Sequence, residues 1–133
     1  MRSVIMGMTV AAALVFAQPA TADTVSDWWE FANKLAPPGG GGTPDQMRST
    51  SRVSLAMFEA LNAIDRRYES YLNLAAGDPT ASQDAAAATA AYLVLVQHYP
   101  AQKTALDDSY AIAMQAVPDA AKREAGRLIG EQA

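Results

Sequence analysis

The sequence has no cysteine and a single histidine, and these two shortages exclude much of the chemistry that proteins use. Without cysteine there is no disulfide, thiolate zinc site, iron–sulfur cluster or cysteine nucleophile. A Ser-His triad would have to use His98 itself. A di-iron bundle needs Glu-x-x-His on two helices, but Leu95 stands where the glutamate would be and there is no second histidine. The residues therefore show little catalytic chemistry.

Positive charge is also scarce. Ten Lys and Arg residues stand against 14 Asp and Glu residues, which gives a formal net charge of −4 for 133 residues. Such a chain has no overall attraction for nucleic acid or for anionic lipid. Half of the residues are hydrophobic, which is enough for a folded core. We expect a folded chain of one domain at most, with no nucleic-acid partner.

The N-terminus has the pattern of a secretory signal peptide. Arg2 precedes an apolar run from Val4 to Phe16, and Ala20-Thr21-Ala22 places small residues where a signal peptidase cleaves. A membrane-spanning helix needs about 20 apolar residues, more than this run provides. Residues 1–22 are therefore predicted to be removed before Asp23, with export to the periplasm or the extracellular space and no stable membrane insertion afterwards. An uncleaved anchor is the alternative.

Proline and glycine divide the remaining chain into helical segments. Asp27 is predicted to cap a short helix that stops at Pro37-Pro38, and the glycines at 39–42 form a linker, so residues 23–42 make one segment. Thr43-Pro44-Asp45 is a strong start for a second helix, which we expect to run to about Tyr68. Its buried face should hold Met57, Leu61, Ile64 and Tyr68, and its solvated face Arg52, Glu59 and Arg66.

The third helix is alanine-rich. Thr80 and Gln83 form a possible capping box, which predicts a start near Ala81, and Pro100 forces the helix to end. Between Ala85 and Val96 the one polar residue is Thr89, so this helix should lie in the interior.

Two further helices follow, opened by Pro100 and by Pro118-Asp119. Their inward faces are predicted to hold Leu106, Tyr110, Ala113, Met114 and Val117 in the first, and Ala121, Ala125, Leu128 and Ile129 in the second. No stretch alternates long enough to predict a strand. The expected fold class is all-α, a bundle of about five helices with residues 43–133 as its main segment.

Four groups of side chains are weighed as sites. A lone His98 without spaced partners is more often structural than a metal ligand. Neighbouring residues diverge by about 100° on a helix, so Asp107 and Asp108 cannot act as a carboxylate pair. The polar set of Glu59, Asn62 and Asp65 is interpreted as a solvated face. The aromatic pair of Trp28 and Trp29 could stack on a sugar, although we expect half of the pair to close the hydrophobic core.

Several blocks resemble the early helices of bacterial vanadium-dependent haloperoxidases and the related type-2 phosphatidic acid phosphatase-like enzymes. The first block is the stretch from Arg52 to Asp65, with Arg67, Tyr68 and Tyr71 after it. The others are the alanine-rich stretch 85–96, Tyr99-Pro100-Ala101-Gln102 with Leu106, and Val117-Pro118-Asp119 with Gly126 and Gly130. Glu59 stands where the family would have an aspartate.

The resemblance implies an enzyme that oxidises halide with peroxide or hydrolyses phosphate esters. In that family one Lys, two Arg and a Ser-Gly turn hold vanadate or phosphate, and two His act on it. These motifs are absent here, so no catalytic, cofactor-binding or metal-binding residue is transferred, and no cofactor is expected within this chain. Vanadate would belong to a full-length family member. We therefore expect a non-catalytic N-terminal segment of a longer, exported all-α enzyme.

Alternatives remain open: a free-standing exported binding or adaptor module, or a structural protein of the envelope. The expected partners are the catalytic helices beyond residue 133, or another copy of the chain. Four aliphatic residues are predicted to face those missing helices and to leave an apolar surface that promotes self-association, namely Leu93, Leu95, Leu128 and Ile129.

Overall fold

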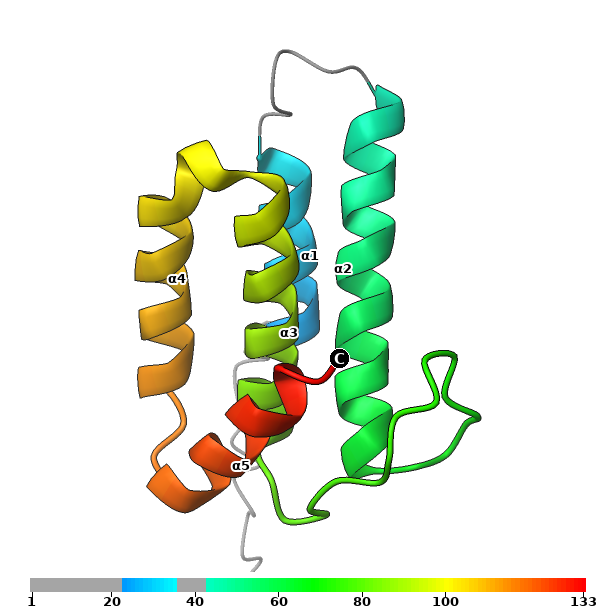
Figure 1. The fold of residues 1–133 in the computed structure, drawn as a ribbon. Helices are drawn as coiled ribbons and strands as arrows, with labels where there is room; N and C mark the ends of the chain where they lie inside the picture. The colour runs from blue at the N-terminus through cyan, green and yellow to red at the C-terminus, as the bar shows by residue number, and fades with distance from the viewer. Residues whose placement is uncertain (1–22, 36–42) are drawn as a thin grey trace, which may run out of the picture.

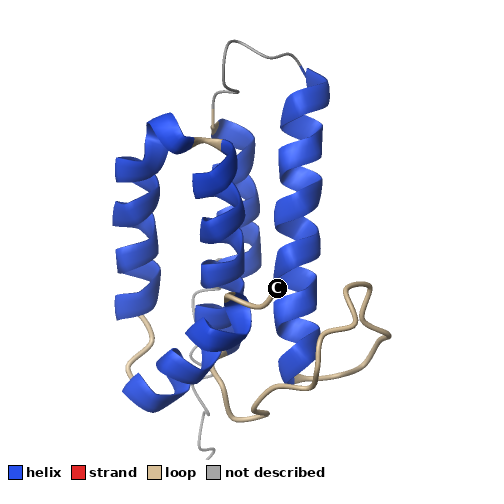
Figure 2. Cartoon of the chain, viewed as in Figure 1, coloured by secondary structure: helices blue, strands red, loops and turns tan. Residues whose placement is uncertain are grey.

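The computed structural model describes residues 23–35 and 43–133, which form helices joined by loops, without any strand (Figure 2). The elements are α1 (Thr24–Lys34), α2 (Thr43–Ile64), α3 (Gln83–His98), the 3-10 turn η2 (Pro100–Gln102), α4 (Lys103–Gln115) and α5 (Ala120–Gly130). The predicted all-α class and the five-helix bundle are confirmed for this part of the chain. The predicted signal peptide and glycine linker lie outside it.

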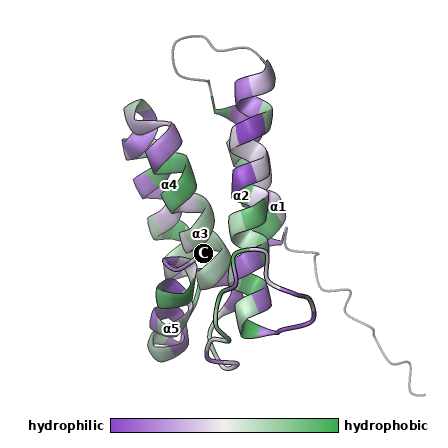
Figure 3. Ribbon diagram, turned by 45° about the vertical axis from the view of Figure 1, so that its right-hand side comes forward, coloured by the Kyte–Doolittle hydropathy of each residue, from purple (hydrophilic) through white to green (hydrophobic). Residues whose placement is uncertain are grey.

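Helix α3 is the centre of the bundle. It packs against α1, α2, α4 and α5, and Figure 1 shows it between α4 and α2 with α5 crossing one end. Every residue from Ala85 to Ala91 is buried, as expected for an interior helix. Figure 3 shows hydrophilic residues on the outer helices, whereas α3 is mostly pale or green. Alanine side chains are small enough to let four helices approach one.

The second half of α3 is less covered. Leu95 is fully buried, but Leu93 is 41% exposed, because α5 crosses only the first turns of α3. Of the four aliphatic residues predicted to stay uncovered, Leu93 and Leu128 are exposed, whereas Leu95 and Ile129 are buried within this chain. That prediction is therefore wrong for Leu95, which packs among residues of α1, α2 and α4, and for Ile129, which packs among residues of α2 and α3.

Helix α5 packs through glycines. A Cβ on Gly126 would lie 2.4 Å from the carbonyl oxygen of Ser82, and one on Gly130 would lie 2.5 Å from that of Ala86. The buried residues of α5 are Gly126, Ile129 and Gly130. The predicted stripe of Ala121, Ala125, Leu128 and Ile129 is wrong at Ala121 and Leu128, which are exposed. The pattern of large side chains missed a backbone-to-backbone contact.

Helix starts follow the capping side chains that are best placed. Asp23 caps α1, not Asp27, which lies in the first turn. Ser82 caps α3 by accepting from the N–H of Ala85, so the start predicted near Ala81 is two residues before the observed start at Gln83. Thr80 instead bonds to Asp78. Asp119 caps α5 as predicted, accepting from two backbone N–H groups.

Helix α2 ends at Ile64, four residues before the predicted end at Tyr68. The Asn62 side chain accepts from the backbone N–H groups of Arg67 and Tyr68 and donates to the carbonyl of Tyr68. These bonds turn the chain away from the helix axis. Tyr68, predicted on the buried face, is consequently 66% exposed.

Glu59 is fully buried, which corrects the prediction of a solvated face. Its carboxylate accepts from the hydroxyl of Ser70 at 2.5 Å and from the backbone N–H of Tyr71 at 2.6 Å. The segment after α2 therefore folds back over the helix and is held there by a buried carboxylate. Asp65 alone of the predicted polar set is exposed, and it pairs with Arg67.

Helices α1 and α4 complete the core from either side of α3. Trp28 and Ala32 of α1, and Leu35 directly after it, lie in the main cluster with Met57 and Leu95. From α4, Leu106 is fully buried; the adjoining Val117 is buried too, and Tyr110, Ala113 and Met114 are half-buried, so the predicted inward face is correct. The stacked rings of Tyr92 and Tyr110, 4.4 Å apart, join α3 to α4.

Candidate functional site

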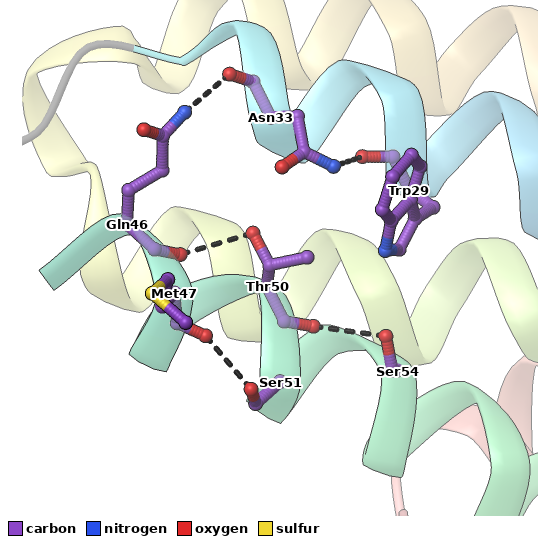
Figure 4. A pocket seen from close by; sticks show the side chains of 7 residues that line it. All are labelled: Trp29, Asn33, Gln46, Met47, Thr50, Ser51 and Ser54. Carbon is purple, nitrogen blue, oxygen red and sulfur yellow. Dashed lines mark hydrogen bonds between the residues drawn. The ribbon is translucent and has the colours of Figure 1, made fainter. Parts of the chain in front are cut away.

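The groove that we call the Trp29 groove lies between α1 and α2 and has a volume of about 590 Å³. This is within the roughly 300–1,000 Å³ of typical small-molecule sites. Figure 4 shows Trp29 and Asn33 from α1 on one side and residues of α2 on the other. The full lining is Trp29, Asn33, Gln46, Met47, Thr50, Ser51 and Ser54.

The neighbouring tryptophans have separate roles. They are about 100° apart around the helix, so they cannot face the same way. Trp28 is 4% exposed and packs in the core with its ring edge against Phe31, whereas Trp29 is 50% exposed and forms a wall of the groove. The expectation that half of the pair closes the core is correct for Trp28. Trp29 is the half that remains available to a ligand.

Hydrogen bonds fix the polar side chains of this groove (Figure 4). The amide of Asn33 donates to the carbonyl of Trp29 at 2.8 Å, and the amide of Gln46 donates to the carbonyl of Asn33 at 2.5 Å. The hydroxyls of Thr50, Ser51 and Ser54 each donate to the carbonyl four residues earlier in α2. The oxygen atoms of all five side chains keep lone pairs that can accept.

No ionisable side chain lines the Trp29 groove, and in the described part of the chain no atom accepts a hydrogen bond from the indole Nε1 of Trp29. The groove therefore combines the aromatic ring of Trp29 and the thioether of Met47 with uncharged hydrogen-bond acceptors. This set can bind and orient a ligand. It cannot perform general acid–base or nucleophilic chemistry, which needs a titrating group or an activated nucleophile.

A second groove of about 370 Å³ lies between α2 and the open half of α3, and we call it the α2–α3 groove. Most of its lining residues are aliphatic. The lining is Arg52, Leu55, Ala56, Leu72, Val94, Gln97, His98 and Ala133. One arginine and one histidine are present in it, with no lysine.

His98 lies at the end of α3 and is mostly buried. Its Nε2 has no hydrogen-bond partner and is 3.8 Å from a carboxylate oxygen of Asp45, while its ring meets Tyr99 edge-on at 4.8 Å. Within residues 23–35 and 43–133 there is no group of three or more His, Asp or Glu side chains that could hold a metal ion. His98 is thus packed against one acid on α2 and one aromatic ring.

Asp107 and Asp108 diverge as expected. Asp107 accepts from Lys103 at 2.6 Å and from the hydroxyl of Tyr92 at 2.6 Å, whereas Asp108 is exposed. The hydrogen bond from Lys103, followed by that from Tyr92, lowers the pKa of Asp107 below its ordinary value, and the same carboxylate raises the pKa of Tyr92. This cluster ties α4 to α3 and serves packing.

The polar α2 residues of the Trp29 groove were missed by the sequence reasoning. Thr50, Ser51 and Ser54 lie on the exposed side of an amphipathic helix, where hydroxyl residues are ordinary. Only the packing of α1 against α2 makes that side a wall. The predicted polar set of Glu59, Asn62 and Asp65 does not form a site, because Glu59 and Asn62 accept hydrogen bonds from the backbone of the segment after α2.

Comparisons of the chain with models of protein families, with curated proteins and with solved structures found no match. The resemblance to haloperoxidases and phosphatases therefore rests on the sequence blocks alone. None of the helices in the described residues is long and apolar enough to cross a membrane.

Proposed function

We propose that this chain is a non-catalytic helical segment that supports the catalytic helices of an exported vanadium haloperoxidase-like or acid phosphatase-like enzyme. The observation that carries the proposal is the α2–α3 groove. There the apolar face of α3 emerges from beneath α5 and is left without a covering helix by the described residues. Helices pack by placing rows of side chains in such grooves.

A non-catalytic role agrees with the side chains found in the described residues, which do not form the anion-binding set of the resembled family. Binding a vanadate or phosphate anion requires several fixed positive donors. The α2–α3 groove offers Arg52 and His98, without the lysine and second arginine of the resembled family. The catalytic groups would thus come from the helices that occupy or adjoin the groove.

The test compares two purified proteins: the 133-residue chain and the product of the reading frame continued past Ala133. Both are assayed for bromide oxidation with peroxide and vanadate, and for hydrolysis of p-nitrophenyl phosphate. We expect activity from the longer product alone. A stop codon immediately after Ala133, or a longer product inactive in both assays, would refute the proposal.

A matched pair of variants in the longer product tests the groove itself. Leu72→Glu places a charge on the groove rim, and Ile112→Glu places the same charge on α4 outside the groove lining. We expect the first to lower activity at least tenfold and the second to leave it unchanged. Equal effects of the two variants would contradict docking at this groove.

A free-standing exported binding module is the second candidate function. The Trp29 groove favours it, because a half-exposed tryptophan with fixed polar neighbours is suited to ligand binding without catalysis. A stop codon after Ala133 together with a ligand in this groove would favour the module over the enzyme segment.

A further inference from the structure

We propose that the Trp29 groove binds a neutral carbohydrate, with the apolar face of one pyranose ring on the indole of Trp29. The inference names the ligand class of the second candidate function and does not depend on the enzyme proposal. It follows from three observations: the exposed aromatic wall, the arrangement of hydrogen-bond acceptors, and the absence of charge in the lining.

The aromatic wall provides a flat apolar surface. Trp29 is half-exposed although its neighbour Trp28 is in the core, so its ring is partly in contact with water in the free protein. A sugar ring has a face of C–H groups that can cover an indole while its hydroxyls project sideways. Tryptophan suits such a contact because it has a large apolar area and a polar N–H at one edge.

The opposite wall provides acceptors. Thr50, Ser51 and Ser54 each use their one hydroxyl proton on a helix carbonyl, so each oxygen meets the groove as an acceptor. The amide nitrogens of Asn33 and Gln46 are directed at carbonyls, which fixes the orientation of both amides. A ligand that fits must bring several donors, as the hydroxyls of a sugar do.

The lack of charge narrows the ligand class. An anion would meet lone pairs and no cation, which is unfavourable. An ammonium or guanidinium ion could lie over Trp29, but the lining has no carboxylate to compensate its desolvation. A neutral ring with several hydroxyl groups needs neither a cation nor a carboxylate in the lining. Its hydroxyls can donate to the acceptors while its apolar face covers the indole.

The site is also rigid before a ligand arrives. All of its lining residues lie on α1 or α2, and each amide and hydroxyl side chain in it is held by a hydrogen bond to a helix carbonyl. Binding then immobilises few additional side chains, and this reduces the entropic cost of association. The groove is open, so a bound ring stays partly in water and we expect weak binding.

The experiment titrates the purified chain with cellohexaose and maltohexaose, followed by calorimetry and by the NMR shift of the Trp29 indole N–H. Saturable binding of at least one oligosaccharide is expected. Trp29→Ala should weaken it at least tenfold, and Trp29→Phe about threefold, because a smaller ring remains. Tyr71→Ala removes a more exposed aromatic ring outside the groove and should change nothing.

A second pair of variants guards against loss of folding. Ser51→Ala and Ser54→Ala remove acceptors whose hydroxyls bond only to their own helix, so the fold should be kept. Each should weaken binding about threefold with an unchanged melting temperature. The proposal is overturned by absence of saturable binding, by affinity unchanged in Trp29→Ala, or by arginine methyl ester binding the groove more tightly than either oligosaccharide.

Discussion

The two halves of α3 are both largely apolar, but they differ in the size of their side chains and in their surroundings. From Ala85 to Ala91 the helix is sealed, because the glycines of α5 bring one backbone directly onto another. From Leu93 to Gln97 the same helix is buried on one side, at Leu95, and open on the other. An apolar helix is therefore buried only where a neighbour approaches it closely enough. Glycine and alanine permit that approach, and larger side chains beyond them leave a groove.

The largest expected effect on stability comes from the buried side of the second half of α3. Leu95→Ala should lower the free energy of unfolding by about 3 kcal/mol, because it leaves a cavity in a fully packed core. Leu93→Ala, two residues away and 41% exposed, should cost less than about 1 kcal/mol. Urea denaturation of both variants measures the difference. Equal losses would mean that Leu93 is covered in solution.

Glu59→Ala tests whether the buried carboxylate of Glu59 keeps Leu72 at the rim of the α2–α3 groove. The variant removes the acceptor for Ser70 and leaves the N–H of Tyr71 unpaired, so we expect a loss of about 2.5 kcal/mol. Glu59→Gln keeps one acceptor and should lose less. Hydrogen exchange should speed up at the Tyr71 amide while the Ala85–Ala91 amides stay protected. Uniform loss of protection would contradict a local clamp.

Gly126→Ala breaks the sealed half directly. Alanine normally stabilises a helix relative to glycine, but here its Cβ would meet the backbone of Ser82 and the side chain of Ala85. Such overpacking should lower the free energy of unfolding by about 2 kcal/mol, measured by thermal denaturation. Ala121→Ser, on the exposed side of the same helix, is the control and should be nearly neutral. A stabilised Gly126→Ala protein would show that α5 does not pack closely.

Leu93→Ser sharpens the comparison from the open side. The free energy of unfolding should fall by about 1 kcal/mol, because the residue is already partly in water and serine favours a helix less than leucine does. We expect weaker ANS fluorescence and less self-association in sedimentation experiments, since an apolar surface has been made polar. Ile112→Ser changes an exposed aliphatic residue on α4 for comparison. If it has the larger effect, self-association does not use the open half of α3.

The smallest effect concerns the link from α3 to α4. Lys103, and then Tyr92, lower the pKa of Asp107 in the folded state. Its contribution to stability is therefore complete above the ordinary pKa of an aspartate and is lost as the pH falls through the lowered value. Lys103→Ala should raise the pKa of Asp107 towards its ordinary value in an NMR titration of the carboxyl carbon. Ser109→Ala on the same helix should leave that pKa where it is.

Local chemistry determined the helices. Asp119 and Pro100 begin elements where the sequence predicted them, and the alanine-rich stretch was correctly predicted to lie inside. Capping, proline geometry and hydrophobic periodicity act within a few residues, so they can be read without knowing the fold. The ends that were wrong, at Asp27, Tyr68 and Ala81, have more than one competent capping or turning group nearby.

The tertiary structure decided what contacts what. Glu59 has the sequence context of a surface residue, and it is buried because Ser70 and Tyr71 return to meet it. Gly126 is buried because the backbone of α5 lies against the backbone at the start of α3, and a pattern of hydrophobic residues does not predict such a contact. Likewise the sequence predicted that half of the Trp28-Trp29 pair closes the core, but the groove beside Trp29 exists because α1 packs on α2. Burial and shape depend on residues distant in the chain, so they are properties of the assembled bundle.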